Sequence, residues 1–142
     1  MNDLLLNSLS ALAYGGVGVA VLIAGYLVVD LLTPGKLHTL IWEERNGNAV
    51  LLVSANTLGT AIVVVSAILS SESEAGLGAG LLSTAVYGAI GLAAMALAFV
   101  LIDVVTPVKI ARMISNAEPH PATWVSATAH VAIALVIAAS LT

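Results

Sequence analysis

The sequence predicts an all-α integral membrane protein with four transmembrane helices. Of the 142 residues, 60% are hydrophobic and only 8% are charged, whereas a soluble domain carries about 25% charged residues. Four uncharged stretches each exceed the ~20 residues that a helix needs to cross the hydrocarbon core. These stretches are Leu4–Val29, Asn46–Ser71, Ala75–Ile102 and Pro119–Thr142. The composition excludes an ordinary soluble domain, and it excludes a disordered chain because disorder requires low hydrophobicity.

An internal repeat divides the chain into two halves. Residues 14–37 align without gaps with residues 87–110, and eight of these 24 positions are identical. The identities include Asp, Thr-Pro and Lys, which weigh more than aliphatic matches because these residues are rare in this chain. We therefore expect two tandem two-helix repeats in the same orientation, related by a pseudo-two-fold axis along the membrane normal.

Each repeat is expected to contain two spanning helices joined by a short amphipathic helix. The first repeat covers residues 1–72, with helices over ~8–32 and ~48–70 and an amphipathic helix over ~34–45. The second covers residues 73–142, with helices over ~82–105 and ~121–141 and an amphipathic helix over ~107–117. Apolar residues at helical spacing predict that the short helices lie in the membrane interface. The alternative is a spanning helix that continues beyond a proline kink.

Caps and charges define these inner loops. Thr33 and Thr106 are the expected N-caps of the amphipathic helices, with Pro34 and Pro107 as their first residues. All four basic residues of the chain lie in the same two loops: Lys36, Arg45, Lys109 and Arg112. By the positive-inside rule, we expect both loops to be cytoplasmic and both termini to lie outside, in a multi-pass membrane protein.

Asp30 and Asp103 are the most distinctive polar residues, each about one turn before the inner end of its helix. A carboxylate there faces the negative end of the helix dipole and is costly in an apolar setting, so it requires a partner. One interpretation is a salt bridge to a cation of the inner loops, and the available cations are Lys36, Lys109, Arg45 and Arg112. Others are a cation or proton site formed by the two carboxylates, and simple exposure to solvent.

Polar side chains also occur within the second helix of each repeat. Asn56 and His130 join Asp30 and Asp103 as candidates for an intramembrane polar or ion site. Histidine ordinarily titrates near neutral pH, so one interpretation places His130 in a proton path. The other is a packing histidine that is hydrogen-bonded to Ser or Thr, because such groups in lipid usually bond across helices.

No catalytic or metal-binding motif accompanies these residues in the sequence. The chain has no cysteine, which excludes disulfides, zinc–thiolate sites and a thiol nucleophile. It also contains no HExxH sequence and no phosphate-binding loop. We therefore expect no enzyme activity and no cofactor, and four basic residues that already set the orientation argue against nucleic-acid binding.

The first repeat carries a characteristic run of motifs: Thr33-Pro34, the Asn-rich turn Arg45–Val50, and Leu58-Gly59. This pattern resembles the YjfL-like family of small bacterial inner-membrane proteins, which is built around a domain of unknown function, and the resemblance covers nearly the whole chain. In the second repeat Glu118–Ala122 replaces the Asn-rich turn, so any role of Asn46 and Asn48 would belong to one half. The resemblance implies two copies of a two-helix unit and an association with envelope-stress systems.

The lipid bilayer is an expected partner of this chain. Two functional hypotheses follow. The first is a non-enzymatic module that forms a homo-oligomer or docks a partner membrane protein, linked to envelope stress. Gly16, Ala20 and Ala24 recur every four residues and would allow close helix packing. The alternative is a small ion or proton channel or transporter component that uses the paired Asp30 and Asp103. A duplicated rotor-ring proteolipid is disfavoured, because such rings carry the carboxylate near mid-membrane on the second helix of a hairpin.

Overall fold

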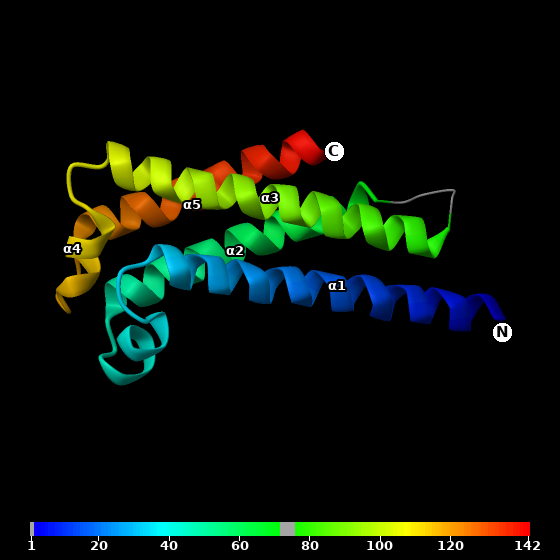
Figure 1. The fold of residues 1–142 in the computed structure, drawn as a ribbon, viewed down its shortest axis with the longest axis horizontal. Helices are drawn as coiled ribbons and strands as arrows, with labels where there is room; N and C mark the ends of the chain where they lie inside the picture. The colour runs from blue at the N-terminus through cyan, green and yellow to red at the C-terminus, as the bar shows by residue number, and fades with distance from the viewer. Residues whose placement is uncertain (1, 72–75) are drawn as a thin grey trace.

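The computed structural model describes residues 2–71 and 76–142, and every regular element in these residues is helical (Figure 1). The four long helices are α1 (Asn2–Leu32), α2 (Gly47–Leu69), α3 (Leu77–Val105) and α5 (Pro121–Leu141). Two short elements lie between them: the π-helix η1 (Thr39–Glu43) and the helix α4 (Ile110–Ser115). The predicted all-α fold is confirmed.

The four long helices are each long and apolar enough to cross a membrane. Large apolar side chains cover their outer surfaces; Leu31 is 84% exposed and Val105 is 80% exposed. Such a surface is unfavourable in water but matches a hydrocarbon surrounding. The four predicted spans are therefore present as candidate membrane spans. α1 and α3 begin at Asn2 and Leu77, earlier than the expected starts near ~8 and ~82.

The four long helices pack as one bundle in which α1 and α3 run in one direction and α2 and α5 run in the other (Figure 1). α2 packs most extensively against α5, and both α2 and α3 contact each of the other long helices. α1 and α5 make no comparable contact with each other. α2 and α3 therefore form the centre of the bundle. The expected two-fold axis would exchange α1 with α3 and α2 with α5, so the α2–α3 contact would have an equivalent contact between α1 and α5. Because α1 and α5 make no such contact, the bundle departs from two-fold symmetry.

Close packing in the middle of the bundle depends on glycines. A Cβ atom at Gly59 of α2 would lie 2.9 Å from Met95 Cε and 3.0 Å from Ala134 Cβ. A Cβ atom at Gly91 of α3 would collide with the side chain of Val63. Val63, Met95 and Ala134 form a buried cluster between α2, α3 and α5. The missing side chains allow these three helices to approach closely, as small residues do in membrane proteins.

The two connections that contain η1 and α4 lie at the same end of the bundle (Figure 1). We call residues 33–46 the first corner and residues 106–120 the second corner. Leu37 and Leu40 of the first corner and Ile110 and Met113 of the second are buried in one cluster with the ends of the long helices. The short helices therefore pack these apolar side chains against the rest of the protein. Their position in the membrane interface stays a prediction.

The expected helix caps are wrong. Thr106 ends α3 with extended backbone, and α4 begins only after Lys109, which is its N-cap residue. Pro107 is therefore not the first residue of a helix. Thr33 and Pro34 likewise lie in a bend between α1 and η1. The residue before a proline avoids the helical backbone conformation, so each Thr-Pro pair ends a helix and does not start one.

Candidate functional site

Asp30 and Asp103 each bind the backbone at the start of the helical turn that follows their corner. Asp30 Oδ1 accepts a hydrogen bond from the N–H of Leu37 at 2.8 Å, and Asp103 Oδ1 accepts one from the N–H of Ile110 at 2.7 Å. The first N–H groups of a helix have no partner within the helix. Each carboxylate therefore does the work of an N-cap side chain from seven residues upstream, and its negative charge suits the positive end of the helix dipole.

The four basic residues are all exposed at the corner end of the bundle. The Lys109 ammonium donates to the backbone carbonyl oxygens of Asp103 at 2.6 Å and of Val104 at 3.3 Å. The Asp103 carbonyl is one that Pro107 leaves without its usual donor, so Lys109 satisfies the last turn of α3. The bonds described for the two carboxylates go to backbone N–H groups, and the salt bridges remain a prediction.

We expect Asp103→Ala to lower the free energy of unfolding by about 2 kcal/mol, because the buried N–H of Ile110 loses a charged acceptor. Asp103→Asn retains an oxygen at the same place and should recover at least half of that loss. Thermal melting of both purified variants in one detergent measures the difference. Equal destabilisation by alanine and asparagine would contradict the capping role and indicate that the charge itself is required.

Asn48 joins the start of α2 to the second corner. Its Nδ2 donates to the carbonyl oxygens of Met113 at 2.9 Å and Glu118 at 2.8 Å, with that of Asn116 at 3.2 Å. Its Oδ1 accepts hydrogen bonds at 3.0 Å from two further groups of the second half, the N–H of His120 and the hydroxyl of Thr123. The buried amide thus uses both of its N–H hydrogens and both lone pairs of its oxygen.

Asn46 makes a second connection beside Asn48. Its Nδ2 donates to the carbonyl oxygen of Ile114 at 2.6 Å, while its Oδ1 caps α2 by accepting from the N–H of Ala49 at 3.1 Å. We call Asn46 and Asn48 the asparagine clamp. The clamp was not among the residues that the sequence singled out as a site. The sequence signal for the clamp is a pair of amides at the start of an apolar helix, where unpaired polar groups are costly.

His130 lies in the interior of the bundle, 1% exposed. Its Nδ1 atom lies 2.7 Å from the carbonyl oxygen of Ser126, one turn earlier in α5. A carbonyl oxygen can only accept, so Nδ1 carries the hydrogen, and in the neutral ring Nε2 is then a free acceptor. Nε2 is buried and has no hydrogen-bond partner among the described residues. The ring packs against Phe99, with a centroid distance of 5.1 Å.

The candidate residues fall into two levels of the bundle. Asp30 and Asp103 lie in the last turns of α1 and α3, next to the corners, whereas Asn56 and His130 are buried farther along α2 and α5. A small cavity of about 120 Å³ is lined by Asp103 and Phe99 of α3, by Pro34 of the first corner and by Ile110 of the second corner, among others. Phe99 also packs against His130, so it contacts both the cavity beside Asp103 and the buried histidine. Among the described residues, no group of three or more His, Cys, Asp or Glu side chains is placed to hold a metal ion.

Comparison with known proteins places these features in a family. Residues 3–141 match the family model described as Domain of Unknown Function (DUF350). A UPF0719 transmembrane protein of Mycolicibacterium paratuberculosis is 33% identical over 141 residues, which cover 99% of this chain and 92% of the relative. UPF0719 transmembrane proteins of Mycobacterium bovis and Mycobacterium tuberculosis are each 37% identical over 141 residues, covering 99% of this chain and 91% of each relative. No solved structure matches the chain.

Proposed function

The chain belongs to the DUF350 family of transmembrane proteins, and from this premise we propose that it is a non-enzymatic membrane module that associates with itself through the face formed by α1 and α3. The observation that carries this proposal is a shallow groove of about 370 Å³ on that face. The groove is lined by small and branched apolar side chains: Val17, Ala20, Val21, Ala24, Ala85, Ala89 and Leu92. Helices in membranes associate through small residues that let their backbones approach.

The polar side chains support a non-enzymatic role by the bonds that they make. The two carboxylates cap helical turns, and the asparagine clamp ties two segments of backbone together. Ser66 of α2 donates to the carbonyl oxygen of Ala138 in α5 at 2.6 Å. These groups hold the bundle together. On the basis of the family resemblance, we extend this proposal to a link with envelope stress. We also extend it to the docking of a partner membrane protein on the same face.

We expect Ala89→Cys to form a covalent dimer when membranes are treated with an oxidant or a short bis-maleimide. The natural chain contains no cysteine, so the introduced thiol is the only one available. Val136→Cys is the matched control, because Val136 is 70% exposed but lies on α5, away from the groove. Gel electrophoresis measures the dimer fraction. A dimer band of equal strength from both variants, or none from Ala89→Cys, would refute the proposed interface.

An ion or proton path is the second candidate, and the unpartnered Nε2 atom of buried His130 favours it. The path would run from His130 and Asn56 toward Asp30 and Asp103. Proton and cation flux into vesicles that contain the purified protein tests this candidate, with the double variant Asp30→Asn/Asp103→Asn as the comparison. Flux that disappears in the double variant would favour transport. An absence of flux in the wild-type protein would leave the self-associating module.

We also propose an orientation of the chain in the membrane and a common origin of its two halves. The two corners would face the cytoplasm of a bacterial plasma membrane, which is supported by the exposure of all four cations at that end. The two halves would descend from one two-helix unit, which is supported by the equivalent bonds of Asp30 with Leu37 and of Asp103 with Ile110. The YjfL-like pattern would then be one branch of the same family.

A further inference from the structure

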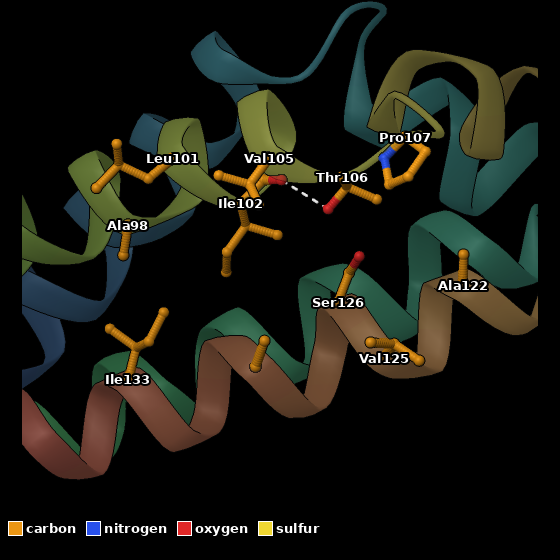
Figure 2. A pocket seen from close by; sticks show the side chains of 11 residues that line it. Ala98, Leu101, Ile102, Val105, Thr106, Pro107, Ala122, Val125, Ser126 and Ile133 are labelled. Atoms are coloured by element: carbon orange, nitrogen blue, oxygen red, sulfur yellow. Dashed lines mark hydrogen bonds between the residues drawn. The ribbon is translucent and has the colours of Figure 1, made fainter.

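A groove of about 670 Å³ runs between α3 and α5 at the corner end of the bundle (Figure 2). It begins beside Thr106 and Pro107 and extends to Ala98 and Ile133. Val105, which lines it, is 80% exposed, so the groove opens to the surroundings of the bundle. Those surroundings are lipid for a membrane-spanning segment, and a groove of this size does not stay empty in a liquid of hydrocarbon chains.

The length of the groove matches one leaflet of a bilayer. On α5 it extends from Ala122 to Ile133, which at ~1.5 Å per residue is about 17 Å. Half of the ~30 Å hydrocarbon core is about 15 Å. The groove therefore reaches from the membrane surface to the midplane and ends where the cluster of Met95 and Ala134 closes the bundle. A helix of a second copy would continue across the midplane, whereas an acyl chain stops there.

The two ends of the groove differ in polarity as the two ends of a lipid do. Figure 2 shows the Ser126 hydroxyl pointing from α5 toward Thr106, whose own hydroxyl donates to the carbonyl oxygen of Ile102 at 2.6 Å. Beyond Pro107 follows Lys109, whose ammonium binds the last carbonyl groups of α3. The other end is lined only by apolar side chains such as Ala98 and Ile133. Two hydroxyls therefore line the corner end of the groove and a cation follows two residues after Pro107, at the end where a headgroup would lie.

The groove belongs to the second half of the chain, and the asparagine clamp explains why. Thr123, in the first turn of α5, is bound to Asn48 and has no exposed surface. The clamp thereby holds the start of α5 against α2 and leaves a space between α5 and the end of α3. In the first half, Val29 occupies the position equivalent to Ile102, but it is buried in the corner cluster.

We propose that the groove between α3 and α5 binds one acyl chain of an anionic phospholipid from the leaflet at the corner end, with the lipid phosphate beside Lys109. This binding site goes beyond the proposed function, since it lies on a different face from the α1–α3 groove. The bound lipid would then be part of the folded bundle. Occupancy of the groove by lipid would be coupled to the position of the second corner.

Lipid retention tests the proposal directly. The full chain is reconstituted into vesicles of equal parts phosphatidylglycerol and phosphatidylethanolamine, extracted in mild detergent and examined by native mass spectrometry. We expect wild-type protein to retain phosphatidylglycerol, and Ala129→Phe, which fills the groove, to reduce that retention at least fivefold. Ala139→Phe places the same ring on an exposed position of α5 outside the groove and should retain lipid as the wild type does. Lys109→Gln should abolish the preference for phosphatidylglycerol.

A photoreactive phosphatidylglycerol with a diazirine in its acyl chain provides a test that needs no substitution. Labels on residues 98–105 and 122–133 of the wild-type chain would support the proposal. Labels spread evenly over all four long helices would overturn it. Equal lipid retention by Ala129→Phe and Ala139→Phe, or wild-type protein that retains no phosphatidylglycerol, would overturn it as well.

Discussion

Asn48→Ala should be among the most destabilising single substitutions in the chain, lowering the free energy of unfolding by about 3 kcal/mol. Removal of the amide leaves the N–H of His120, the hydroxyl of Thr123 and the carbonyl oxygen of Met113 without this partner. Each buried group that loses its partner costs about 1–3 kcal/mol. Interhelical bonds in membranes contribute less, about 0.6 kcal/mol on average, so our estimate lies at the low end of the summed cost of about 3–9 kcal/mol for these three groups.

The same substitution should release the second corner from α2. Lys109 and Arg112 provide trypsin sites in this corner, and we expect the purified Asn48→Ala protein to be cut there several times faster than the wild type. Asn116→Ala is the matched control, because its side chain is exposed and the clamp uses only its backbone carbonyl. Similar melting and cleavage of the two alanine variants would show that the clamp does not hold the corner.

Gly59→Leu should disrupt the centre of the bundle, at a cost of about 3 kcal/mol, the upper end of the range for overpacked cores. The first added carbon would already lie 2.9 Å from Met95 Cε and 3.0 Å from Ala134 Cβ. Met95 can move the end of its flexible side chain, whereas the Cβ of Ala134 moves only with the backbone of α5. A leucine therefore forces α2 and α5 apart, and these two helices share the most extensive contact in the bundle.

Gly15→Leu provides the control for this substitution. A Cβ atom at Gly15 in α1 would meet nothing within 4 Å, and replacing an exposed helical glycine favours the helix by about 0.5–1 kcal/mol. Thermal melting in one detergent, together with the recovery of monodisperse protein, measures both variants. A Gly59→Leu protein that melts at the wild-type temperature would refute close packing of α2, α3 and α5 at this position.

Sequence patterns were sufficient for the spans and insufficient for the corners. The apolar stretches identified four long helices because length and hydropathy are properties of one segment at a time. The Thr-Pro pairs do mark helix boundaries, but we predicted that they start helices and the structure shows that they end them. Proline is compatible with the first turn of a helix and also restricts the residue before it. Only the structure shows that Thr106 ends α3 and that Asp103 caps the next helix.

The sequence by itself determined that the chain is a four-helix membrane protein with its four cations, Asp30 and Asp103 at one end, because composition and spacing act locally. The tertiary structure decided which partner each polar group takes. Asn48 forms hydrogen bonds with backbone groups and a hydroxyl that lie 65 to 75 residues away, and no local pattern encodes a bond at that separation. It also decided that the groove forms between α3 and α5 and that the equivalent Val29 is buried. Near-identical motifs diverge in role because the clamp acts in one half only.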